Sequence, residues 1–266
     1  MEKGSETFLL LKCLIKNCFN GNLKSRFPMQ PEKKKMLSIV LNGPSVNRTI
    51  HYLNKDETDI MMANYAPLTP LYKDLNPQYV CIADSYFKKN TKRNRILWEE
   101  LEKSSDKVIV FLPHYLKRQG FFSAKRLKVQ YIFSPTEIKN YDVFSYKLLE
   151  ENLLAPIYYN VAIMCIYVGI QLGYKRINLY GADEDFMKEL SVDKNNKVMR
   201  ESVHYYGKEV FCENTLHKFD MEMMMYMAYM TFNGLKRMKN YAIKENVKIV
   251  NMSDSSWIDF FKRFVE

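Results

Sequence analysis

Short apolar runs alternate with longer amphipathic stretches along most of this chain. Runs bounded by polar or turn residues predict strands at residues 37–41, 59–62, 79–83, 107–112, 129–133, 176–180 and 247–250. Apolar positions at helical spacing predict helices at residues 45–53, 90–103, 157–173, about 214–244 and 257–264. Strands that alternate with helices indicate an α/β, Rossmann-like fold, with a mainly parallel sheet and helices on both faces.

The pattern changes at about residue 35. Residues 1–35 join an apolar stretch that carries lysines to a segment rich in Gly, Asn, Pro and Lys, which predicts an N-terminal appendage and linker. Two interpretations of its helical stretch stay open. It is a helix on a membrane surface, with Lys12 and Lys16 at the rim, or a helix packed on the core or on a second subunit. Residues 36–266 are the predicted α/β domain, with a lid at about 186–212.

Composition and charge narrow the choice of partners. A chain of 266 residues with 47% apolar residues can bury a substantial core. The formal net charge of +10 favours polyanions, anionic lipid headgroups or phosphate-bearing small molecules, and a basic surface kept for solubility is the alternative. No apolar run reaches the roughly 18 to 20 residues of a membrane span, so we expect no transmembrane helix.

The cysteines and histidines show no metal-binding spacing. The cysteines lack a CxxC pair, which indicates a reducing compartment and a cytoplasmic location; they are Cys13, Cys18, Cys81, Cys165 and Cys212. The histidines lie far apart, with no second His or Cys at ligand spacing; they are His51, His114, His204 and His217. We therefore expect no metal cofactor.

Ligands of a parallel sheet collect at the carboxyl ends of its strands, so the residues that follow the predicted strands are the candidate site. The turn Asn42-Gly43-Pro44-Ser45 offers amide and hydroxyl donors, a flexible glycine, and Ser45 as the expected N-cap of the next helix. An ordinary strand-to-helix connection would have the same residues. The other positions after strands are Asn64, Asp84, Gly181 to Asp185, and residues 252–256, which include Ser255.

The segment Gly181-Ala182-Asp183-Glu184-Asp185 brings three carboxylates to the end of one strand. They could recognise hydroxyl groups or hold a divalent metal with a nucleotide's phosphates, and the first interpretation is favoured. Asp183 is the expected functional member, and Glu184 and Asp185 are interpreted as solvated loop charges.

Residues 191–208 are polar and poorly periodic, which favours an active-site lid. His204 lies near its end and suits general base catalysis on a hydroxyl, while Tyr205 and Tyr206 can donate hydrogen bonds to a departing phosphate. A structural histidine is the alternative. Tyr158, Tyr159 and Asn160 open the helix before the strand at 176–180 and could face the same crevice, although a purely structural role is the favoured interpretation. The methionine-rich residues 221–230 are interpreted as core filler.

Three segments resemble bacterial sialyltransferases of glycosyltransferase family 42. They are the opening strand with Asn42-Gly43-Pro44-Ser45, residues 172–183 (LGYKRINLYGAD) and residues 202–207 (SVHYYG), in the same order and spacing. Capsule and surface-polysaccharide proteins related to that family, with a similar Gly-Ala-Asp turn and His-aromatic-Tyr element, are a still closer likeness. The resemblance covers roughly residues 36–260 and implies a GT-A-like variant of the Rossmann-like fold with a lid.

The resemblance implies an inverting, metal-independent transferase that uses CMP-sialic acid or a related CMP-activated acidic sugar. It makes His204 the base that deprotonates the acceptor hydroxyl and places Asp183 at the donor site. The residues expected to bind the nucleotide or donor are Asn42, Gly43, Pro44, Ser45, Asn64, Asp84, Asn160, Gly181, Tyr205, Tyr206 and Ser255.

Two departures from the family pattern concern the donor. Residues 155–160 (APIYYN) replace the family's Arg-Thr-Ser-Gly element, and Asp185 stands where the sialyltransferases have a phosphate-binding tyrosine. Donor identity and leaving-group stabilisation therefore stay open. Asp183 or Asp185 acting as a nucleophile would give a retaining mechanism instead.

The sequence thus predicts a CMP-sugar-dependent glycosyltransferase of surface polysaccharide or lipooligosaccharide synthesis. We expect a glycan or lipid-linked glycan acceptor, no nucleic-acid partner and a cytoplasmic location. Peripheral contact with the inner face of the plasma membrane and homo-oligomerisation are left open. The alternatives are an ATP-dependent pyrophosphokinase of the hydroxymethylpterin type, which would need magnesium, and a catalytically inactive nucleotide-binding scaffold.

Overall fold

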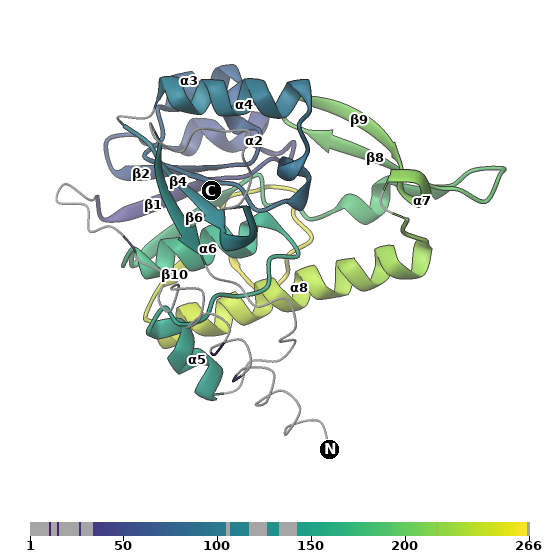
Figure 1. Ribbon diagram of the computed structural model, residues 1–266. Helices are drawn as coiled ribbons and strands as arrows, with labels where there is room; N and C mark the ends of the chain where they lie inside the picture. Colours follow the sequence, from purple (N-terminus) through teal and green to yellow (C-terminus); the bar gives the residue numbers. More distant parts are fainter. Residues whose placement is uncertain are drawn as a thin grey trace.

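Parallel strands form one large sheet at the centre of the computed structural model (Figure 1). The structure describes residues 11, 15, 27, 34–104, 107–116, 127–132, 143–216 and 218–264. Within them, the sheet has eight strands in the order β11-β10-β6-β1-β2-β3-β4-β5. In chain order these are β1 (Met36–Val40), β2 (Thr58–Ala63), β3 (Tyr79–Cys81), β4 (Ile109–Pro113), β5 (Lys128–Ile132), β6 (Arg176–Tyr180), β10 (Lys248–Asn251) and β11 (Lys262–Arg263).

The central strands are buried on both faces, which explains their continuous apolar sequence. In β1, Leu37 and Ile39 face one hydrophobic core and Val40 faces the other. Helices α6 (Val161–Gln171) and α8 (Met221–Lys244) cover the first core, while α3 (Pro70–Leu75) and α4 (Lys92–Lys103) cover the second (Figure 1). The predicted α/β class with helices on both faces is confirmed.

Shorter elements connect these layers. The remaining α-helices of the described residues are α2 (Val46–Thr49), α5 (Val143–Glu150) and α7 (Glu213–Leu216), and the 3-10 turns are η1 (Ile50–Tyr52), η2 (Ala66–Leu68), η3 (Ser85–Lys88), η4 (His114–Leu116) and η5 (Phe186–Glu189). The long helix predicted at about 214–244 is two helices. The chain between them adopts a left-handed conformation at Lys218, with φ of 58°, which a continuing helix cannot include.

The helix predicted at residues 257–264 is wrong. This segment contains no helix; it is irregular up to Phe261 and then forms the short strand β11, which pairs with β10. The backbone N–H of Trp257 donates to the carbonyl oxygen of Asp183 over 2.7 Å, and Ile258 and Phe261 are buried in the first core. Long-range contacts therefore outweigh the local helical pattern.

The predicted lid region contains an antiparallel sheet of β7 (Leu190–Val192), β8 (Val198–His204) and β9 (Gly207–Cys212). It lies beside α7 and the N-terminal end of α8 (Figure 1). Much of β9 is exposed or half-buried on both faces, which explains why the sequence lacks a clear alternation. His204 pairs with Gly207, so Tyr205 and Tyr206 form the two-residue turn of a β-hairpin.

Most of the predicted appendage at residues 1–35 lies outside the described residues. Phe27 is one of the few described residues of this segment. Its ring packs against Phe111 and Tyr167 in the first core, at centroid distances of 6.1 and 5.9 Å. No helix in the described part of the chain combines the length and apolar character of a membrane span.

Candidate active site

The strand order of the sheet reverses at β1, because β2 to β5 follow on one side of it and β6, β10 and β11 follow on the other. Such a switch point leaves a crevice at the carboxyl ends of the strands. The loops after β1 and β6 are joined there by backbone hydrogen bonds, from Leu41 N–H to Tyr180 O at 2.8 Å and from Gly43 N–H to Gly181 O at 3.0 Å. A cavity of about 720 Å³ opens above them.

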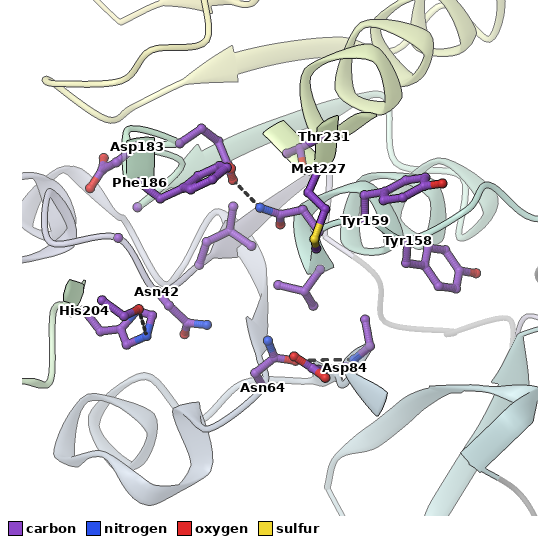
Figure 2. Close-up of a pocket in the computed structure, with 18 of the residues that line it drawn as sticks. Asn42, Asn64, Asp84, Tyr158, Tyr159, Asp183, Phe186, His204, Met227 and Thr231 are labelled. Carbon is purple, nitrogen blue, oxygen red and sulfur yellow. Dashed lines mark hydrogen bonds between the residues drawn. The ribbon is translucent and has the colours of Figure 1, made fainter. Parts of the chain in front are cut away.

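Loops after β1, β2, β3 and β6 line this cavity together with the start of α6, part of α8 and β8 of the small antiparallel sheet. Figure 2 shows His204 beside Asn42, and Asp84 beside Asn64. The lining residues that the sequence singled out are Asn42, Gly43, Pro44, Asn64, Asp84, Asn160, Gly181, Asp183 and His204. Residues far apart in the sequence are thus brought to one cavity.

Asp183 locks the turn after β1. Its Oδ2 accepts a hydrogen bond from the backbone N–H of Ser45 over 2.9 Å. An added Cβ on Gly43 would lie 2.4 Å from the same oxygen, so this close approach requires glycine. Asp183 is 2% exposed, and burial raises the pKa of its carboxyl. The expected N-cap role of Ser45 is wrong, since its side chain makes no cap hydrogen bond and its backbone is already helical.

The amide of Asn42 also lines the cavity. Among the described residues, its buried Oδ1 has no hydrogen-bond partner. An unpaired buried acceptor costs about 1–3 kcal/mol. A ligand that donates a hydrogen bond here, after a small rotation of the amide, would recover that free energy.

Asn64 and Asp84 hold the loops after β2 and β3. Asn64 has a left-handed backbone, with φ of 52°, and its Oδ1 accepts from the backbone N–H of Ala83 at 3.3 Å. Asp84 accepts from the backbone N–H of Tyr86 at 2.7 Å and so caps η3. Both side chains therefore have a structural role and still reach the cavity.

His204 ends β8 at the edge of the cavity. Its Nε2 lies 3.1 Å from Ser202 Oγ, and its ring stacks on Tyr206 with centroids 5.1 Å apart. The hairpin is fixed to the turn after β1, because Tyr205 N–H donates to Asn42 O over 3.0 Å. Burial lowers the pKa of the imidazole below its usual 6.5. The ring is therefore largely neutral at pH 7 and able to accept a proton.

Four predicted site residues do not line the cavity: Ser45, Tyr205, Tyr206 and Ser255. The side chain of Ser45 is buried behind the turn. Tyr205 packs on the second core, with its hydroxyl 3.1 Å from Thr69 Oγ1. Tyr206 lies behind His204, and Ser255 Oγ accepts from Arg48 on the exposed surface at 2.9 Å.

Glu184 also belongs to the site, although its sequence position was interpreted as that of a solvated loop charge. Glu184 is half-buried in the cavity lining, and its Oε1 accepts from Asn160 Nδ2 over 2.6 Å. Burial raises the pKa of its carboxyl to about 7. The sequence signal was its place directly after the strand and the Gly-Ala-Asp turn.

Lys88 and Arg200 also line the cavity and were not predicted. Lys88 Nζ lies 4.8 Å from the ring centroid of Tyr115, and Arg200 forms an ion pair with the buried Glu213 at 2.7 Å. Of these two lining cations, Arg200 is therefore paired with a carboxylate, whereas Lys88 contacts an aromatic ring. Within the described residues, no group of three His, Cys, Asp or Glu side chains is arranged to hold a metal ion.

No protein-family model matches the chain, and neither does any curated protein sequence. Among solved structures, it is similar to the monofunctional α-2,3-sialyltransferase Cst-I from Campylobacter jejuni, with 16% identity, a TM-score of 0.50, and coverage of 91% of this chain and 84% of that one. An α-2,3-sialyltransferase of the same organism in apo form has 15% identity, a TM-score of 0.47 and coverage of 90% and 85%. The likeness to Cst-I shows that the chain has a sialyltransferase-like fold, as the sequence resemblance implied.

Proposed function

We propose that this chain is a glycosyltransferase that moves a sugar from a CMP-activated donor to a hydroxyl group of a glycan acceptor. The observation that carries the proposal is the position of His204, a neutral base held over a cavity at the switch point of a sialyltransferase-like sheet. The unpaired acceptor of Asn42 supports a polar ligand in the same cavity. An acidic sugar, sialic acid or a related 2-keto sugar, remains part of the proposal from the sequence resemblance.

The proposed reaction is a direct displacement. The acceptor hydroxyl gives its proton to the imidazole of His204, and its oxygen bonds to the anomeric carbon. The bond from that carbon to the CMP phosphate oxygen breaks, and its electron pair leaves with CMP. Lys88 is the lining cation suited to stabilise the charge on the departing phosphate.

This route inverts the anomeric centre. A retaining route would need a carboxylate nucleophile, but Asp183 is 2% exposed with its Oδ2 bound to the turn after β1, and Asp185 pairs with Lys188 at 3.2 Å. These contacts favour His204 as the reacting group. We further propose that the transfer needs no metal ion. It would serve surface polysaccharide or lipooligosaccharide synthesis in the cytoplasm. Peripheral membrane contact through residues 1–35 is part of the same proposal.

Thermal-shift measurements with CMP, CDP, UDP, GDP and ATP, each with and without magnesium, test the nucleotide. Stabilisation by CMP that survives EDTA supports the proposal. Stabilisation confined to ATP with magnesium would replace it with the pyrophosphokinase, and no response to any nucleotide would favour an inactive scaffold.

The His204→Ala variant tests the base. We expect kcat for transfer from a CMP-sugar to fall by about 100-fold or more, with the affinity for CMP unchanged. His51→Ala is the control, because His51 is exposed on η1 and does not line the cavity. Equal rates in wild type and His204→Ala would remove the proposed base.

A further inference from the structure

The carboxylates that line this cavity would repel an anionic donor. Carboxylates outnumber cations among its lining residues, although a nucleotide sugar carries phosphate. The lining acids are Asp84 on the loop after β3, Asp183, Glu184 and Asp185 after β6, and Glu189 on η5; the lining cations and titratable groups are Lys88 on η3, Tyr115 on η4, Tyr158 and Tyr159 before α6, and Arg200 and His204 on β8. The lining residues of α6 and α8 carry no charge.

Glu184 differs from the other lining acids in its partners. Each of the others has a backbone or cationic donor: Ser45 N–H for Asp183, Tyr86 N–H for Asp84, Val203 N–H for Glu189 and Lys188 for Asp185. Within the described residues, Glu184 accepts a single hydrogen bond, from Asn160 to Oε1, and no ion pair reaches it. Burial raises the pKa of Glu184, and the charges of Asp183 and Asp185, which repel a carboxylate at this position, raise it as well.

The orientation of Asn160 leaves the second oxygen of Glu184 available. Asn160 is the N-cap of α6, and its Oδ1 accepts from the backbone N–H of Ala162 over 2.7 Å. This cap fixes the amide so that Nδ2, and not Oδ1, faces Glu184. With Oε1 occupied by Nδ2, Oε2 is the atom of Glu184 left for a ligand in the cavity.

We propose that Glu184 binds the anionic donor as a neutral acid, donating a hydrogen bond from its carboxyl group to a ligand oxygen. This inference rests on the proposed function. A protonated Glu184 has no negative charge and donates a hydrogen bond, so an anion can bind in a cavity that is lined mostly by acids. The receiving oxygen belongs either to the phosphate or to a sugar carboxylate. Because burial already raises the pKa of Glu184 to about 7, an adjacent anion raises it further, and binding takes up a proton.

The test is the dissociation constant of CMP, and separately of free N-acetylneuraminic acid, measured by calorimetry from about pH 6 to about pH 9. Above pH 7 we expect the affinity of wild type for the ligand to fall. The ratio of wild-type affinity to Glu184→Gln affinity should drop by up to about tenfold per pH unit. The glutamine keeps the shape but has no proton to lose. Ionisation of CMP itself affects both proteins equally, so their ratio isolates Glu184. A pH-dependent ratio for CMP assigns the contact to phosphate, and one for the sugar acid alone assigns it to the carboxylate.

Two further variants sharpen the test. Asn160→Ser keeps a capping side chain but removes the amide that stabilises the carboxylate, so the fall in affinity moves to higher pH. Glu99→Gln removes the same charge from an exposed position on α4 and leaves the pH profile unchanged. The same pH dependence in wild type and Glu184→Gln, or wild-type affinity that rises relative to the variant with pH, overturns the inference alone. Absence of CMP binding to every variant at every pH overturns the proposed function and this inference with it.

Discussion

Asn160 donates a 2.6 Å hydrogen bond to Glu184 with the same side-chain amide that caps α6. The helix that covers the first core and the acid that lines the cavity therefore share one residue. A substitution at position 160 can remove the cap of α6, which stabilises the fold, and the hydrogen bond to Glu184, which lies in the cavity. A substitution that keeps the cap but loses the amide separates the two effects.

Asn160→Ala removes both hydrogen bonds, whereas Asn160→Ser retains a capping oxygen. We expect the alanine variant to lose about 1 kcal/mol of unfolding free energy and the serine variant only a few tenths. Urea denaturation followed by circular dichroism measures the difference. Equal losses in the two variants would show that the cap contributes nothing at this helix end.

Glu184→Gln changes the pH dependence of stability. Because the pKa of Glu184 rises to about 7 in the folded chain from an ordinary 4.5, folding favours its protonated form. That contribution is fully present below about pH 4.5 and is lost as pH rises to about 7. Without ligand, we expect the variant and wild type to melt together at the acid end and the variant to melt higher above pH 7. A constant difference in Tm across this range would contradict the raised pKa.

Gly43→Ala tests the contact between the turn after β1 and Asp183. The new Cβ would lie 2.4 Å from Asp183 Oδ2 and 2.5 Å from the backbone oxygen of Gly181, neither of which can move freely. We expect a loss of about 1–3 kcal/mol in unfolding free energy and weaker nucleotide binding. Gly234→Ala is a matched control, since its Cβ meets only the flexible end of Ile163 at 2.5 Å, and the helix gains about 1 kcal/mol of propensity. A control variant as damaged as Gly43→Ala would refute this reading of the turn.

The main sheet was predictable because its strands are buried on both faces, so each is an apolar run between turn residues. The end of the chain was not. Residues 257–264 have apolar residues at helical spacing, but Ile258 and Phe261 enter the first core from an irregular, non-helical backbone. That choice depends on Asp183, whose carbonyl binds Trp257 N–H and which lies more than 70 positions away along the chain.

The candidate site was predictable where a residue directly follows a strand, as with Asn42, Asn64 and Asp183, because parallel topology brings those positions together. Orientation within a turn was not. Neighbouring tyrosines of one hairpin face the second core and the ring of His204 instead of a phosphate. The environment that changes the chemistry of Glu184 likewise depends on its contact with Asn160 at the start of α6, which local sequence does not encode.

The stack of Tyr206 on His204 makes Tyr206 a positioning residue for the proposed base. Tyr206→Leu removes the ring, so we expect kcat for transfer to fall about tenfold while the KM for the donor stays within about twofold, because an imidazole displaced from the acceptor hydroxyl loses rate and not donor affinity. Tyr206→Phe keeps the ring and removes only a hydroxyl that does not line the cavity, so its kcat and its pH–rate profile should match wild type. A loss in Tyr206→Phe as large as in Tyr206→Leu would mean that the phenol itself acts in the reaction. A rise in donor KM with unchanged kcat in Tyr206→Leu would mean that the ring supports donor binding and not the base.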